Sequence, residues 1–108
     1  MIDYENFKKL FNVLNNEPEI EVYFKNSKNT YMIIKYKDYI TFQRCGIKEK
    51  QSGEIKFTNI DELYNSKTID NIFLKQDWSN VKDILINSTF SVVDDKEDIK
   101  KIYGIDLI

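Results

Sequence analysis

The chain has 108 residues, a formal net charge of −2 and no histidine, and Cys45 is its only cysteine. These counts exclude catalytic triads and zinc sites that need imidazole, and they exclude an internal disulfide. A chain of this length with 42% hydrophobic residues predicts a single compact domain over residues 1–108.

The composition is skewed toward lysine, asparagine, isoleucine and tyrosine, while alanine is absent. The depleted residue types have GC-rich codons, which indicates an AT-rich genome, such as that of a low-GC bacterium or one of its phages. The first residues are acidic where a secretory signal needs cations and an apolar run. No apolar run approaches the roughly 20 residues that cross a bilayer. We therefore expect a cytoplasmic protein without a membrane partner, and the lone thiol agrees with that location.

Residues 2–15 have the spacing of an amphipathic helix. Apolar side chains recur at intervals of three and four, which places them on one face. These side chains are Tyr4, Phe7, Leu10, Phe11 and Leu14. Asp3 is a suitable N-terminal cap, and Pro18 follows the end of the helix.

The period then changes to two, which predicts an antiparallel meander with one buried face. The expected strands cover residues 20–25, 30–37, 39–45 and 55–58, with a tight turn at Lys37-Asp38 and a polar loop from Gly46 to Glu54. The alternation in each strand predicts a set of inward side chains. The set is Ile20, Val22, Phe24, Met32, Ile34, Tyr36, Ile40 and Phe42.

Helical signals dominate the last third of the chain. Asn59 and Glu62 have the spacing of a capping box. Residues 77–86 place Trp78, Val81 and Leu85 on one helical face, which predicts a second helix with these three side chains in the core. Asp94-Asp95 opens a last short helix that ends at Gly104, and 89–93 is a candidate edge strand. The predicted fold class is α+β: an N-terminal helix, a four-stranded antiparallel meander with a candidate fifth strand, and C-terminal helices packed mainly on one face.

Tyrosines and lysines alternate on the predicted outward face of the meander. The candidate partner-binding residues are Tyr23, Lys25, Tyr31, Lys35, Lys37, Tyr39 and Lys56. Such a face suits a protein partner, because tyrosine is enriched at interfaces. It also suits single-stranded nucleic acid, whose bases stack on aromatic rings while lysines contact phosphates. The single arginine and the acidic net charge make nucleic acid the less favoured partner.

Glu54-Ile55-Lys56 on a strand, with Asp38 upstream, resembles the PD-(D/E)xK nuclease signature. The resemblance implies that Asp38 and Glu54 bind a divalent metal while Lys56 orients the attacking water. The helix, three-stranded meander and helix in this order are also similar to the core of that family. A minimal metal-dependent nuclease is therefore the second alternative.

Cys45 has no histidine to activate it, and the acidic residues from Asp94 to Asp98 lack the spacing of a calcium loop. Residues 21–58 carry eight cations and four anions, whereas residues 59–108 carry six and ten, so the charge is divided along the chain. We predict a non-enzymatic protein without a cofactor that binds another protein. An inhibitor, a toxin-immunity protein or a phage or mobile-element factor that targets the host fits this profile. The sequence does not assign an oligomeric state.

Overall fold

A computed structural model describes residues 1–45 and 53–107, so most of the predicted loop from Gly46 to Glu54 lies outside the described residues. The fold is α+β, as predicted. In chain order the elements are α1 (Tyr4–Val13), β1 (Glu19–Phe24), β2 (Thr30–Lys35), β3 (Ile40–Arg44), β4 (Glu54–Phe57), α2 (Ile60–Tyr64), α3 (Leu74–Asp77), β5 (Val81–Ile86), β6 (Phe90–Ser91) and α4 (Lys96–Tyr103). Short 3₁₀ turns at Ile69–Asn71 and Trp78–Asn80 flank α3.

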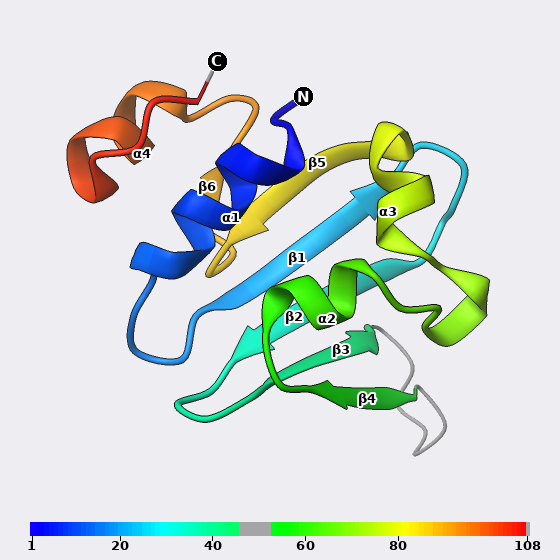
Figure 1. The fold of residues 1–108 in the computed structure, drawn as a ribbon. Coiled ribbons are helices and arrows are strands. Elements are labelled where there is room, and N and C mark those ends of the chain that lie inside the picture. The colour runs from blue at the N-terminus through cyan, green and yellow to red at the C-terminus, as the bar shows by residue number, and fades with distance from the viewer. Residues whose placement is uncertain (46–52, 108) are drawn as a thin grey trace.

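The strands form one antiparallel sheet in the order β4-β3-β2-β1-β5-β6. The segment from α2 to α3 leaves edge strand β4 and crosses the sheet to reach β5 beside β1. Figure 1 shows α1, α2 and α3 in front of the same face of the sheet, with α4 beside α1. The core lies between this helix layer and the sheet. Within the described residues the domain therefore has two layers, and the helices cover one face.

The predicted helix over residues 77–86 is wrong, and the predicted four-stranded meander is part of a larger sheet. Trp78–Asn80 is a 3₁₀ turn, and Val81–Ile86 is strand β5. Val81, Ile84 and Leu85 have helical spacing, but Ile84 and Ile86 also alternate. The strand form pairs Ile84 with Val22 and Ile86 with Ile20, and all four side chains are buried. The candidate strand at 89–93 is present as the two-residue β6.

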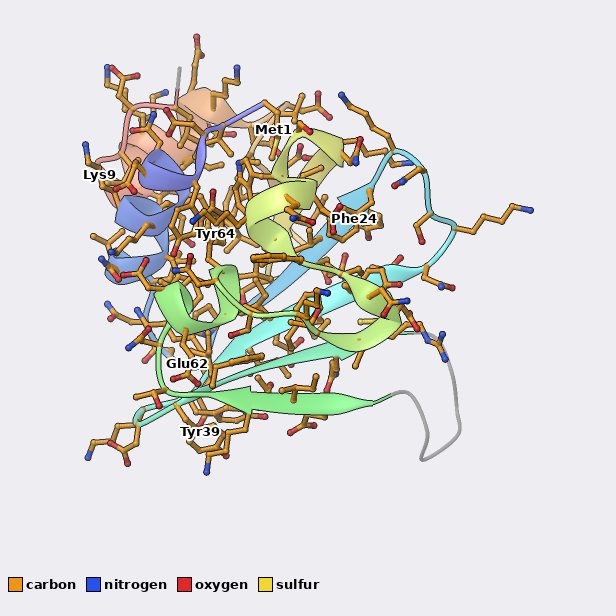
Figure 2. The ribbon with its side chains drawn as sticks, turned by 45° about the vertical axis from the view of Figure 1, so that its right-hand side comes forward. Met1, Lys9, Phe24, Tyr39, Glu62 and Tyr64 are labelled. Carbon is orange, nitrogen blue, oxygen red and sulfur yellow. The ribbon has the colours of Figure 1, made fainter. Side chains whose placement is uncertain are left out.

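Helix α1 follows the predicted pattern closely. The Asp3 carboxylate accepts a hydrogen bond from the Asn6 backbone N–H at 2.8 Å, which satisfies one of the free donors of the first turn. The apolar face is buried from Tyr4 to Phe11. Tyr64 lies between α1, α2 and α3 in Figure 2, and its ring stacks on that of Tyr4 at 3.5 Å. Trp78 completes the cluster as a core residue, and its indole N–H donates to the Ile2 carbonyl at 2.9 Å.

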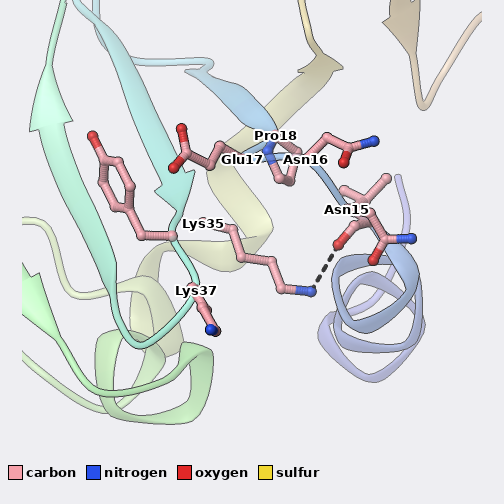
Figure 3. A pocket seen from close by; sticks show the side chains of 8 residues that line it. Asn15, Asn16, Glu17, Pro18, Lys35 and Lys37 are labelled. Carbon is pink, nitrogen blue, oxygen red and sulfur yellow. Dashed lines mark hydrogen bonds between the residues drawn. The ribbon is translucent and has the colours of Figure 1, made fainter.

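Lys35 of β2 stabilises the carboxyl end of α1. Figure 3 shows its ammonium group at the last turn of that helix. Nζ donates to the carbonyls of Phe11 at 2.7 Å and Leu14 at 3.0 Å, with a longer contact to Asn12 at 3.4 Å. A cation at this position bonds carbonyls that have no partner within the helix, and it interacts favourably with the helix dipole. The first turn of α1 contains Glu5 and the last turn contains no basic residue, so β2 supplies the cation that α1 lacks.

Replacing Lys35 with methionine tests this contact. Lys35→Met keeps the apolar stem but leaves the carbonyls of Phe11 and Leu14 without their donor, so we expect a loss of about 1–3 kcal/mol in the free energy of unfolding. Urea denaturation followed by circular dichroism measures it. The matched control is Lys37→Met in the neighbouring exposed turn, which we expect to change stability by less than about 0.5 kcal/mol. Equal effects of the two variants would contradict the role assigned to Lys35.

Asp61 joins α2 to α1. Its carboxylate accepts a hydrogen bond from the Tyr4 hydroxyl at 2.6 Å and forms an ion pair with Lys8. The hydrogen bonds from Lys8 and Tyr4 hold the pKa of Asp61 below its usual range. Burial and the Asp61 contact raise the pKa of Tyr4, so the phenol stays protonated and continues to donate.

This arrangement gives a pH dependence with a defined sign. A carboxyl group whose pKa is lower in the folded state stabilises the fold above its unfolded pKa of about 3.9. The contribution disappears as the pH falls through the folded-state pKa. We expect Asp61→Asn to lower the urea midpoint at pH 7, with a smaller difference from the wild type at pH 3. A difference that grows on acidification would contradict this assignment.

Candidate functional site: the open face of the sheet

The register of the sheet decides which side chains face away from the helices. Val22 pairs with Tyr31 and Ile20 with Ile33, so Tyr31 and Ile33 share the buried face of β1. Both are almost completely buried, at 2% and 0% exposure. The prediction that Met32, Ile34 and Tyr36 point inward is therefore wrong. The inward assignments of Ile20, Val22, Phe24, Ile40 and Phe42 are confirmed, since all five are buried on the helix side.

The structure separates the predicted partner-binding residues into three groups. Tyr23, Tyr39 and Lys56 lie on the face away from the helices. Tyr31 and Lys35 lie on the helix side, which corrects their predicted outward placement: the Tyr31 hydroxyl donates to Asp70 at 2.6 Å, and Lys35 contacts α1. Lys25 and Lys37 are exposed in the turns beside the sheet.

We use the term open face for the outward side chains of the described strands and of the β2–β3 turn. They are Glu19, Glu21, Tyr23, Thr30, Met32, Ile34, Tyr36, Tyr39, Thr41, Gln43, Glu54, Lys56, Lys82, Asp83, Leu85 and Ser91. One row crosses β5, β1, β2, β3 and β4 in the order Leu85, Glu21, Met32, Gln43, Glu54. The sequence prediction did not include Glu21, Met32, Leu85 or Asp83 in the site.

The carboxylates on β1 and β5 are oriented by hydroxyl groups. The Tyr23 hydroxyl donates to Glu21 Oε2 at 2.6 Å, and Ser88 Oγ donates to Oε1 at 3.0 Å. Ser91 Oγ lies 2.9 and 3.0 Å from the two Asp83 oxygens. The Glu21 contact, together with partial burial, raises the pKa of Tyr23 to about 12. These hydroxyl donors orient the two carboxylates without placing a positive charge beside them.

Aromatic rings cover the end of the open face near the β2–β3 turn. Tyr36 and Tyr39 stack with centroids 4.9 Å apart, and Lys56 Nζ lies 4.0 Å from the Tyr39 centroid. Figure 2 shows Tyr39 at the rim of the molecule beside β4, away from Tyr64 in the helix layer. Thr41 is flanked by Ile34 and Lys56 in the register and is only 1% exposed. Among the described residues its hydroxyl has no hydrogen-bond partner.

Cys45 follows β3 on the same side, where its N–H donates to the Thr30 carbonyl at 2.7 Å. Burial raises the pKa of its thiol, and the charges of Glu21 and Glu19 raise it further. The adjacent Arg44 does not counteract this effect, because its guanidinium contacts Asp70 at 3.3 Å. The thiol is therefore poorly suited to act as a thiolate nucleophile at neutral pH.

The residues that resemble a nuclease signature do not form a metal site. Asp38 lies in the turn before β3, whereas Glu54 pairs with Gln43 toward the far end of that strand. About five residues of extended chain, roughly 16 Å, separate them. Residues 1–45 and 53–107 contain no group of three or more histidine, cysteine or acidic side chains placed to hold a metal ion. The described structure therefore does not bring Asp38 and Glu54 together.

Two cavities lie outside the open face. One, of about 320 Å³ beside the end of α1, includes Lys35, Glu17 and Pro18 in its lining (Figure 3). Its buried ammonium already has carbonyl partners. The other, of about 340 Å³, is lined by polar side chains that include Asp70. The Asp70 carboxylate already contacts Tyr31 and Arg44. The Lys35 ammonium of the first cavity and the Asp70 carboxylate of the second are therefore already bound to groups of the chain itself.

Cysteine labelling tests which side chains of β2 are outward. In a Cys45→Ser background, we expect Met32→Cys to react with a maleimide in the native state and Ile33→Cys to react only after denaturation. The reason is that Ile33 has 0% exposure beneath the helices, whereas Met32 is half-buried on the open face. Mass spectrometry of the modified chain measures both rates. Faster reaction of the Ile33→Cys variant would overturn the register.

No protein-family model matches the chain, and searches of curated proteins and of solved structures find no significant match. In the part of the chain that the structure describes, no helix has the length and apolar character needed to cross a membrane. The arguments about function therefore rest on the geometry of the open face.

Proposed function

We propose that this chain is a small non-enzymatic protein that acts by binding another protein through the open face. Its biological class would be an inhibitor, a toxin-immunity protein or a phage or mobile-element factor that targets a host protein. That class agrees with the small size and with a composition typical of AT-rich genomes. A cytoplasmic location, as the sequence predicts, belongs to the same proposal.

One observation carries the proposal: helices cover one face of the sheet, while half-buried apolar side chains line the other. Met32 and Ile34 lie on β2 of the open face, and Leu85 lies on β5, with Glu21 of β1 between Met32 and Leu85. Tyr23, Tyr36 and Tyr39 extend this surface toward its ends. Half-buried apolar and tyrosine side chains among polar ones are typical of a protein interface, where tyrosine and methionine are enriched.

The composition of the open face does not favour the nucleic-acid alternative. That alternative depends on a sheet face with several lysines next to tyrosines. Lys35 points to the helix layer, and Lys25 and Lys37 lie in turns. Lys56 and Lys82 are the cations on the open face of the described strands. Phosphate groups would instead meet the carboxylates of Glu21 and Asp83.

The test is capture of a partner by the tagged protein from a lysate of the source organism, with and without nuclease, followed by reconstitution with the purified partner. We expect Ile34→Arg to weaken the complex at least about tenfold, because it places a charge in the buried centre of the interface. The matched control is Ile102→Arg on α4, which is 55% exposed outside the open face and should bind normally.

Circular dichroism and urea denaturation establish that both variants remain folded. A complex that Ile34→Arg leaves intact, or that Ile102→Arg disrupts equally, would contradict binding through the open face. If the tagged protein captures material only in the absence of nuclease, the result would support the nucleic-acid alternative instead.

A further inference from the structure

We infer that the open face binds a cationic protein surface, with a partner lysine or arginine held against Glu21 and Asp83. This inference rests on the proposed function and specifies the chemistry of the partner. It contrasts with the sequence pattern, in which the residues of the meander carry a net positive charge.

The open face has more acidic than basic side chains. Its described strands carry Glu19, Glu21, Glu54 and Asp83, against Lys56 of β4 and the exposed Lys82 beside Asp83 on β5. Among the described residues, the ion pairs are Lys8–Asp61, Arg44–Asp70 and Lys100–Asp106. Each pair lies outside the open face. The four carboxylates therefore have no basic side chain within 4.0 Å in the described structure.

Glu21 and Asp83 are positioned to receive one charged group together with its apolar stem. They are diagonal neighbours on adjacent strands, two positions apart in the register, since Tyr23 pairs with Asp83 and Glu21 with Leu85. Hydroxyl donors already fix both carboxylates, so less side-chain entropy is lost when a partner binds. Leu85 and Met32 flank Glu21 on either side. They provide the apolar contact that the methylene stem of a lysine or arginine needs.

The same charge pattern disfavours other occupants of the face. Two copies of the chain packed face to face would bring four carboxylates on each side together, with only Lys56 and Lys82 on each side to compensate. An acidic protein or a nucleic acid would meet the same repulsion. Complementarity of charge therefore selects a basic protein surface with apolar side chains among its cations.

A random-peptide phage library panned on the immobilised full-length protein tests the inference with a defined probe. We expect selected peptides to be rich in lysine, arginine and apolar residues, with affinity that falls as salt is raised. Glu21→Gln with Asp83→Asn should weaken these peptides at least about fivefold, because it removes two charges with little change of shape. The matched control is Glu97→Gln with Asp98→Asn on α4, which should leave affinity within about twofold.

The outcomes separate the two proposals. One outcome is that the peptides lose affinity for the Ile34→Arg variant, but are not enriched in cations and bind the Glu21→Gln, Asp83→Asn variant as tightly as the wild type. That outcome would overturn this inference and leave the proposed function standing. If the selected peptides bind both the Ile34→Arg variant and the Glu21→Gln, Asp83→Asn variant as tightly as the wild type, the open face is not the binding surface. The inference then fails as well. Selection of acidic peptides would overturn the cationic partner directly.

Discussion

The bond between the Lys35 ammonium and the carboxyl end of α1 fixes the faces of the central strands. A lysine that points into the helix layer is tolerated only when its charge has partners, because burial lowers its pKa and disfavours the charged form. Phe11 and Leu14 supply carbonyl oxygens at 2.7 and 3.0 Å. The same contact closes the open end of α1. One side chain thus satisfies its own charge, caps a helix and joins the two layers of the domain.

The orientation of β2 then determines the charge of the open face. When Lys35 points inward, Tyr31 and Ile33 do the same, and the Tyr31 hydroxyl reaches Asp70. Met32 and Ile34 must then face outward, because successive side chains of a strand alternate. The face loses a lysine and gains an apolar centre between carboxylates of β1, β4 and β5. A basic segment of sequence consequently folds into a sheet with an acidic outer surface.

Local signals in the sequence predicted the parts of the fold that depend on local chemistry. Asp3 and Asn59 cap their helices as expected, and Gly104 ends α4 with a positive φ of 72°. Which side chains of β2 face the helices depends on pairing between strands, because the segment 31–36 has apolar side chains on both faces. A two-residue turn at Lys37-Asp38 pairs Tyr36 with Tyr39 and Lys35 with Ile40. An inward Ile40 therefore already required an inward Lys35. For β5, helical and strand spacings coexist in one short segment, and pairing with β1 decides between them.

The open face gathers carboxylates on two neighbouring strands. Glu19 and Glu21 lie on β1, a central strand, and Asp83 of β5 lies diagonally from Glu21, so like charges repel one another on this face. Neutral side chains at these positions would relieve that repulsion, yet hydroxyl groups of Tyr23, Ser88 and Ser91 hold the charges in place. Two copies packed face to face would repel each other through these charges despite the apolar centre of the face. The charges also leave that centre accessible to a surface of opposite charge. The same side chains would thus disfavour self-association and favour a basic partner.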